Sequence, residues 1–300
     1  MPVIRTPDER FKNLPDFPFQ PHYVEVNGLR IHYIDEGEGE VILCLHGEPS
    51  WSFLYRTMIP ILSRNHRVLA MDFAGFGRSD KFTERSEYSF KMHHDTLVGF
   101  INALGLEQIT LVVHDWGGLV GLTIASEMPE RFARLVIMNT GLPTGDEPLG
   151  RAFMRWCEYA ISSPDMHIGV VIQMGVARGD KIAPEVLAAY ESPFPDVTYK
   201  AGALAFPLLV PSHPTDPGAA EIRRARALLA QWHKPALVMF SDKDPITRGE
   251  DIFFRALIPT AKDQPEIVIH DAGHFLQEDK GEEIAQHIVD FIARTSTHTK

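Results

Sequence analysis

Short, almost entirely apolar segments recur along the chain and alternate with stretches of helical periodicity. The apolar segments cover Val41–Leu45, Arg67–Met71, Thr110–His114, Leu135–Asn139, Pro235–Phe240 and Glu266–His270. Such segments are typical of strands buried on both faces, as in a parallel sheet covered by helices. The helical stretches between them cover Ser52–Leu62, Ser89–Leu104, Trp116–Glu127, Gly249–Leu257 and Glu282–Arg294. This alternation predicts an α/β fold with helices on both faces of a mostly parallel sheet.

A hairpin is predicted ahead of the first apolar segment. Asn27-Gly28 separates two short alternating runs, Tyr23–Val26 and Leu29–Ile34, and this dipeptide favours the tight turn of a β-hairpin. Adding these two strands to the six apolar segments predicts a sheet of eight strands.

The alternation fails between Thr140 and Pro217, where the chain is rich in aromatic residues and proline and has no clear buried strand. We interpret this stretch as a helical cap inserted into the α/β domain. The predicted organisation is therefore a main domain of residues 1–140 and 217–300 and a cap of residues 141–216.

The composition of the chain limits the kinds of binding partner and the cellular compartment that we expect. The formal net charge is −11, which argues against nucleic acid or an anionic membrane surface as a partner. No apolar run is long enough to predict a transmembrane helix, and the N-terminus has charges and prolines where a signal peptide is apolar. The two cysteines, Cys44 and Cys157, do not suggest disulfides or a metal site. We expect a cytoplasmic monomer without metal or other cofactor.

The strongest chemical signal is Val113-His114-Asp115-Trp116-Gly117-Gly118. It lies between a predicted strand and a predicted helix, which is the context of a nucleophile elbow, where the nucleophile is normally the serine of G-x-S-x-G. By itself the motif is equally compatible with a turn in which Asp115 is an ordinary helix N-cap.

Three other elements follow predicted strands. His46-Gly47-Glu48-Pro49 lies where this architecture places a backbone donor to an oxyanion. Asp244 follows the strand that ends near Phe240, and His274 follows the last strand. The order nucleophile, acid, histidine is that of α/β-hydrolases, so the four elements together favour a catalytic triad.

An aspartate at the elbow indicates displacement at a saturated carbon. A serine that attacks such a carbon forms an ether, which water does not cleave under mild conditions, whereas an aspartate forms an ester. The carboxylate is ionised at neutral pH and needs no base for the first step. His274 would be the base for ester hydrolysis, with Asp244 orienting its ring.

Four segments carry a family resemblance: HGEPSW at 46–51, HDWGG at 114–118, SPFPDVTYKAG at 192–202 and DAGHF at 271–275. They resemble haloalkane dehalogenases of the α/β-hydrolase superfamily that have an Asp-His-Asp triad and two halide-binding tryptophans. HDWGG alone is weak evidence for this family, because epoxide hydrolases also carry it. HGEPSW together with the cap segment SPFPDVTYKAG is much more specific. The resemblance covers nearly the whole chain.

The resemblance implies a role for each matched residue. Asp115 would be the nucleophile, His274 the base and Asp244 the acid, in preference to Asp242. Trp116 and Trp156 would donate indole N–H hydrogen bonds to the leaving halide. An indole N–H only donates, so it stabilises the developing anion without transferring a proton. The backbone N–H groups of Glu48 and Trp116 would form the oxyanion hole, and the Glu48 side chain would help hold the water. The implied substrate pocket contains Leu119, Phe153, Phe206, Pro207, Val210 and Ile246.

The expected reaction is hydrolysis of a small haloalkane to a primary alcohol, halide and a proton through an alkyl-Asp115 ester. An epoxide hydrolase is the first alternative, because Tyr159, Tyr190 and Tyr199 in the cap could protonate an alkoxide. Glu48 and Trp156 argue against it. A haloacid dehalogenase of this fold would carry arginine where Trp116 stands. A non-catalytic binding protein is the last alternative, although no triad member is missing.

Overall fold

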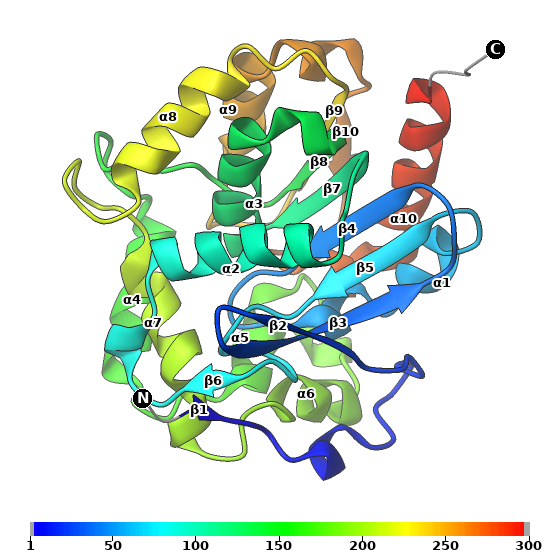
Figure 1. Ribbon diagram of the computed structural model, residues 1–300. Helices are drawn as coiled ribbons and strands as arrows, with labels where there is room; N and C mark the ends of the chain where they lie inside the picture. Colours follow the sequence, from blue (N-terminus) through cyan, green and yellow to red (C-terminus); the bar gives the residue numbers. More distant parts are fainter. Residues whose placement is uncertain (1–2, 297–300) are drawn as a thin grey trace.

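The computed structural model describes residues 3–296 and contains the predicted eight-stranded sheet in the order β10-β9-β8-β7-β4-β5-β3-β2 (Figure 1). The strands are β2 His22–Val26, β3 Leu29–Glu36, β4 Val41–Leu45, β5 Arg67–Met71, β7 Ile109–His114, β8 Phe132–Met138, β9 Ala236–Ser241 and β10 Ile267–Ile269. Strands β10 to β5 pair in parallel, whereas β3 is antiparallel to both of its neighbours. The mostly parallel sheet predicted from the apolar segments is confirmed.

The hairpin turn between β2 and β3 forms where Asn27-Gly28 predicted it. Both residues have positive φ, 53° for Asn27 and 80° for Gly28, as the two-residue turn that matches strand twist requires. A small second sheet was not predicted. It pairs β1 Val3–Ile4 with β6 Lys81–Phe82, and two residues per strand are too few to produce a recognisable pattern.

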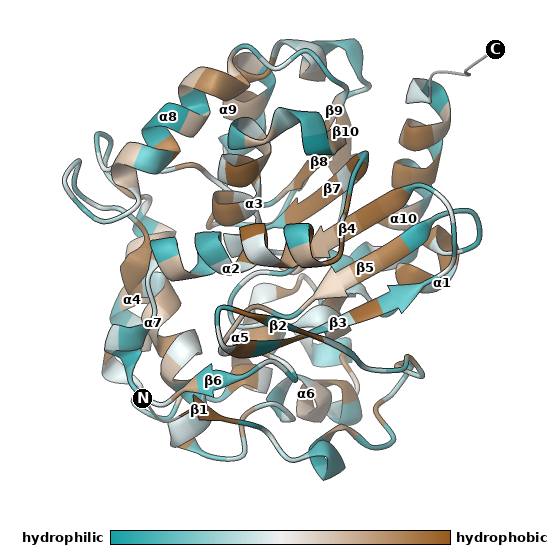
Figure 2. Cartoon of the chain, viewed as in Figure 1, coloured by the Kyte–Doolittle hydropathy of each residue, from teal (hydrophilic) through white to brown (hydrophobic). Residues whose placement is uncertain are grey.

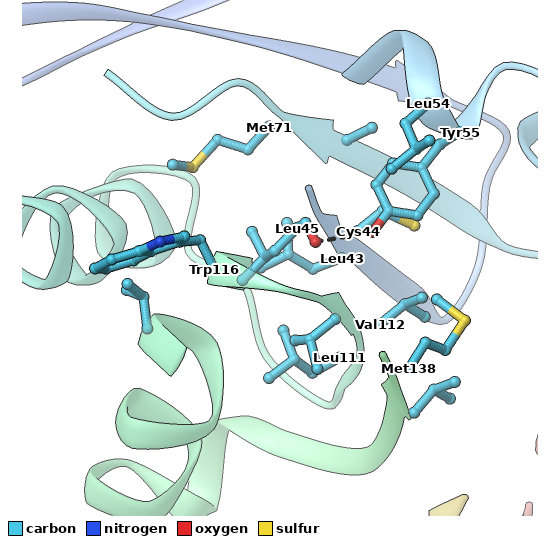
Figure 3. Close-up of a cluster of buried hydrophobic side chains, with 14 of the residues drawn as sticks. Leu43, Cys44, Leu45, Leu54, Tyr55, Met71, Leu111, Val112, Trp116 and Met138 are labelled. Carbon is cyan, nitrogen blue, oxygen red and sulfur yellow. Dashed lines mark hydrogen bonds between the residues drawn. The ribbon is translucent and has the colours of Figure 1, made fainter. Parts of the chain in front are cut away.

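The centre of the sheet is the hydrophobic core. Every residue of β7 is buried, and β4 is coloured as hydrophobic along its length in Figure 2. Leu43, Cys44 and Leu45 of β4 lie beside Leu111 and Val112 of β7 (Figure 3). Burial raises the pKa of the Cys44 thiol, so Cys44 is an inert core residue.

Helices cover both faces of the sheet, with α2, α3, α8 and α9 on one side and α1 and α10 on the other (Figure 1). Their bounds are α1 Ile59–Leu62, α2 Phe90–Ala103, α3 Trp116–Glu127, α8 Ala219–Leu229, α9 Glu250–Leu257 and α10 Leu276–Thr295. Helices α2, α3 and α9 lie within a residue of the predicted bounds.

Two helices differ from the prediction. Ser52–Leu62 is not one helix but a 3-10 turn, Ser52–Tyr55, followed by α1. Pro60 has no N–H to continue a helix and is tolerated only in a first turn. Helix α10 begins at Leu276 rather than Glu282 and is kinked at Lys280. The kink precedes Gly281, which packs against Thr57 with no room for a Cβ, so the helical period breaks there.

Residues 141–216, all of which are described, contain helices and no strand. The helices are α4 Arg151–Ser162, α5 Ile168–Gly175, α6 Pro184–Glu191 and α7 Ala201–Leu209. They lie together beside the ends of the central strands (Figure 1), as the predicted cap would. Nowhere in residues 3–296 is a helix both long and apolar enough to cross a bilayer.

Candidate active site

Asp115 lies at a sharp turn between β7 and α3. Its backbone has φ 49° and ψ −120°, an unfavourable conformation for a residue with a side chain that functional sites often retain. The turn is possible because Gly117 packs against the Leu45 carbonyl and Gly118 against Thr140, neither with space for a Cβ. Thr140 Oγ1 also donates a hydrogen bond to the Asp115 carbonyl at 2.6 Å. The predicted elbow is therefore present, and Asp115 makes no side-chain N-cap hydrogen bond.

The two carboxylate oxygens of Asp115 have different environments. Oδ1 accepts a hydrogen bond from the backbone N–H of Glu48 at 2.8 Å. Oδ2 lies 3.6 Å from Nε2 of His274. Gly47 makes the close approach possible, because a Cβ there would overlap the Asp115 side chain. Of the two backbone donors predicted for this carboxylate, the Glu48 N–H is in place, whereas no hydrogen bond within residues 3–296 joins the Trp116 N–H to it. Oδ2 faces His274.

Asp244, and not Asp242, is the acid beside His274. Its Oδ2 lies 2.9 Å from Nδ1 of His274, and its carboxylate also accepts hydrogen bonds from Ile246 N at 2.8 Å and Thr247 Oγ1 at 2.5 Å. Asp242 instead pairs with His270 at the surface. The structure thus brings Asp115, His274 and Asp244 together from three loops at one edge of the sheet.

The three groups perturb one another's pKa values. Burial alone would lower the pKa of His274, but the carboxylates of Asp244 and Asp115 outweigh it and raise that pKa to about 10. Burial would raise the pKa of Asp244, but His274 and the hydrogen-bond donors hold it at about 2. Asp115 also has a lowered pKa, because His274 outweighs the effect of burial. These shifts favour an imidazolium between two carboxylates in the resting site.

The position of His274 depends on three residues to which the sequence assigned no role. Its carbonyl accepts hydrogen bonds from Asn139 Nδ2 at 3.0 Å and lies 2.8 Å from Nε2 of His114. Asp279 accepts hydrogen bonds from the backbone N–H groups of Gly273 and Ala177, which joins this loop to the cap. His114 lies in the HDWGG segment, whereas no short motif marks Asn139 or Asp279.

Glu48 contributes a buried carboxyl group to the site. Its side chain is 5% exposed, and Oε1 has no hydrogen-bond partner within the described residues. Burial and the neighbouring Asp115 carboxylate raise the pKa of Glu48 well above its usual range. The neutral form is favoured, so this group can both donate to and accept from a water molecule.

Trp116 and Trp156 both line a cavity of about 410 Å³ beside Asp115. Trp116 begins α3 and stacks on Phe206 with ring centroids 4.3 Å apart. Trp156 lies on α4, is half-buried and stacks on Tyr159. No hydrogen bond involves either indole nitrogen among residues 3–296. The cavity thus has two indole groups without protein partners on its wall.

The predicted pocket residues divide into two groups. Phe153, Pro207 and Ile246 line the cavity with Glu48, Asp115 and His274. Leu119, Phe206 and Val210 are not among the lining residues. Phe206 is fully buried behind Trp116, so it supports the indole instead of facing the cavity.

Several lining residues were not among the predicted pocket residues, notably Tyr159, Arg155, Met174 and Lys243. The helical period of α4 could have indicated Tyr159, one turn after Trp156. In the described part of the chain, no three His, Cys, Asp or Glu side chains are grouped so as to hold a metal ion.

Comparisons with known proteins agree with this geometry. Residues 40–160 match the family model of the alpha/beta hydrolase fold. The haloalkane dehalogenase of Psychrobacter cryohalolentis is 47% identical, over 97% of this chain and 98% of its own length. Haloalkane dehalogenase DpaA of Paraglaciecola agarilytica, whose structure is described as tetrameric, superposes with a TM-score of 0.91 at 37% identity, over 100% of both chains.

A relative with a different activity is less similar. The cis-3-alkyl-4-alkyloxetan-2-one decarboxylase of Shewanella oneidensis is 33% identical, over 93% of this chain and 90% of its own length. The full-length match at 47% identity, together with the elbow aspartate and its triad partners, settles the family. This chain belongs to the haloalkane dehalogenases, hydrolases of the α/β-hydrolase fold that act on carbon–halide bonds.

Proposed function

We propose that the protein hydrolyses small haloalkanes through a covalent ester on Asp115. The observation that carries the proposal is the placement of Asp115 on the cavity wall, with its Oδ2 3.6 Å from Nε2 of His274 and two indole groups lining the same cavity. Water is the co-substrate, and the products are a primary alcohol, a halide ion and a proton.

In the first step, Asp115 Oδ2 attacks the carbon that bears the halogen, and the carbon–halogen bond breaks as the carbon–oxygen bond forms. The halogen leaves with the bonding electron pair and becomes an anion. The indole N–H groups of Trp116 and Trp156 stabilise this charge without transferring a proton. Because Asp115 is already ionised, this step requires no base.

In the second step, His274 removes a proton from water, which attacks the ester carbonyl carbon of Asp115. The negative charge that develops on Oδ1 is stabilised by the Glu48 N–H, which already donates to that oxygen. Collapse of the intermediate breaks the bond between Cγ and the alcohol oxygen, and the imidazolium returns a proton to the alcohol. The remaining proton of the water passes from the regenerated Asp115 carboxyl group to His274, which restores the resting state.

The first step also prepares the base for the second. The pKa of His274 is about 10 in the resting site, partly because Asp115 is charged. Esterification removes that charge, so the pKa of His274 falls and the neutral imidazole becomes accessible near neutral pH. His274 is therefore an imidazolium beside the nucleophile and a base only after the ester has formed.

An epoxide hydrolase needs a proton donor for the alkoxide, which cap tyrosines usually provide. Of the three cap tyrosines, Tyr159 lines the cavity. Tyr190 is buried elsewhere and donates to Glu278 at 2.7 Å, and Tyr199 is not a lining residue. The two indole groups suit a halide better than an alkoxide, because they stabilise an anion without protonating it.

The direct test is a halide-release assay on a small panel that contains 1-bromobutane, 1,2-dibromoethane, a terminal epoxide and a cis-3,4-dialkyl-oxetan-2-one. Bromide release with alcohol formation is expected, and Asp115→Ala serves as the inactive control. Turnover of the epoxide or the oxetanone without bromide from either haloalkane would overturn the proposal.

Replacing Trp156 by phenylalanine should weaken halide binding and slow the displacement step. One donor of this type is worth about 3–4 kcal/mol at an oxyanion. A halide is larger and more diffuse, so we expect a loss of about tenfold in affinity, or roughly 1.4 kcal/mol. Quenching of tryptophan fluorescence by bromide measures the affinity.

Trp232→Phe is the matched control, because Trp232 is buried away from the cavity and its indole nitrogen has no partner in residues 3–296. Unchanged bromide affinity and turnover in Trp156→Phe would show that Trp156 only packs within the cap.

For the assembly state, we retain the monomer expected from the sequence. The tetrameric relative, DpaA, shows that this fold also forms a larger assembly.

A further inference from the structure

We propose, resting on the dehalogenase function above, that Arg155 and Lys243 form a carboxylate-recognition site at the mouth of the cavity. It would favour haloalkanes that carry a carboxylate at the end remote from the halogen. Both residues line the cavity, and both are exposed to solvent, Lys243 with a side chain 48% accessible. A side chain that lines a cavity and also reaches solvent stands at its opening.

One face of α4 forms this part of the wall. Phe153, Trp156 and Tyr159 line the cavity one helical turn apart, and Ala152 and Arg155 lie on the adjacent edge. Along this face, Trp156 and Phe153 continue the apolar interior that contains Asp115. Arg155 is the exposed member of the face, so α4 presents a cation where the apolar surface ends.

The charges around the cavity differ by depth. The lining carboxyl groups are the buried Glu48 and Asp115, which lies beside the buried His274. The exposed charged residues of the lining are both basic, in a chain whose net charge is −11. Lys243 is paired with Asp271, so Arg155 is the cation at the mouth without an ion-pair partner in residues 3–296, and its charge favours a substrate with negative charge at its outer end.

Arg155 is the more available of the two cations. Lys243 already pairs with Asp271, which also lies 3.7 Å from Arg178. No side-chain hydrogen bond or ion pair within residues 3–296 involves Arg155. An arginine presents a planar fork of donors that matches a carboxylate, so Arg155 can bind a carboxylate without breaking an existing ion pair.

The length of the substrate's carbon chain should decide whether its carboxylate reaches this site. A short haloacid would hold its carboxylate in the apolar interior near Asp115, where burial and the like charge are unfavourable. A longer chain fills the interior with methylene groups and brings its carboxylate to the mouth. The preferred substrates are therefore ω-halocarboxylates of intermediate or greater length, with short haloacids disfavoured.

The test compares kcat/KM for 6-bromohexanoate with that for 6-bromohexan-1-ol, which has the same chain length without the charge. In Arg155→Gln, the ratio of acid to alcohol should fall by about two- to fivefold, because a solvent-exposed charge pair contributes modestly. Arg155→Glu should lower it further. Adding sodium sulfate should reduce the preference of the unmodified protein for the acid.

Arg151→Gln is the matched control, because Arg151 is an exposed arginine one turn earlier on α4 that does not line the cavity. The acid-to-alcohol ratio of kcat/KM in Arg151→Gln should equal that of the unmodified protein. In a series from 3-bromopropanoate to 8-bromooctanoate, the ratio to the matching bromoalcohol should rise with length.

If the ratio of kcat/KM for the acid to that for the alcohol is equal in the unmodified protein, Arg155→Gln and Arg155→Glu, the proposed recognition site is wrong. It is also wrong if the loss affects acid and alcohol alike, which would indicate a role in halide release or cap packing. These results leave the dehalogenase function intact if the alcohol substrate still releases bromide. Absence of bromide from every substrate would overturn the function itself.

Discussion

His274→Gln should release about one halide per active site and then stall. The first step uses the preformed Asp115 carboxylate, whose Oδ1 remains hydrogen-bonded to the Glu48 N–H, so alkylation should survive the change. Hydrolysis of the ester requires a base to activate water, and loss of a general base typically costs about 10²–10⁴-fold. The alkyl-enzyme should therefore accumulate.

Rapid-quench measurement of bromide gives the size of the burst, and intact-mass spectrometry gives the mass of the added alkyl group. Peptide mapping should place that group on Asp115. Asp115→Ala should give neither burst nor adduct, with circular dichroism to verify that it folds. Normal turnover in His274→Gln, or an adduct on another residue, would mean that the roles of Asp115 and His274 are assigned wrongly.

Asp244→Asn should nearly abolish ester hydrolysis. The Asp244 carboxylate lies 2.9 Å from Nδ1 of His274 and is itself held by Ile246 and Thr247. An asparagine amide can turn its NH₂ toward the ring and favour the wrong tautomer. In serine proteases, the equivalent change lowers kcat by about 10⁴-fold, and we expect a loss of similar order here in the decay of the alkyl-enzyme.

In Asp244→Asn, the pH dependence of ester hydrolysis should shift to lower pH. His274 must be neutral to act as the base, so the rate of hydrolysis falls as pH drops below its pKa in the alkyl-enzyme. Asp244 is the main carboxylate that raises this pKa, and removing its charge lowers the pKa. The acidic limb of the residual activity should therefore shift to lower pH, as measured by single-turnover decay of the ester across a pH series.

Asp242→Asn is the matched control, since Asp242 lies two residues earlier and pairs with His270 at the surface. Its rates and pH profile should resemble those of the unmodified protein. A large loss in Asp242→Asn with little loss in Asp244→Asn would exchange the roles of these two residues.

The sequence by itself determined the elements whose signals are local. Buried parallel strands are apolar throughout, so β4 and β5 were predicted with their observed bounds. Turn chemistry is also local: Asn27-Gly28 specified the hairpin, and the glycines after Asp115 specified the elbow. Because the carboxyl ends of parallel strands meet at one edge of a sheet, the order of Asp115, Asp244 and His274 was enough to predict that they meet.

Only the tertiary structure decided which side chains face the cavity and how the catalytic groups are held. Phe206 was expected to line the pocket, yet it stacks behind Trp116, and Arg155 was not expected there at all. The Asp279 contacts that join the His274 loop to the cap have no sequence motif. Burial, hydrogen-bond distances and pKa shifts arise between residues far apart along the chain, and periodicity reports only which residues are near neighbours within one helix or strand.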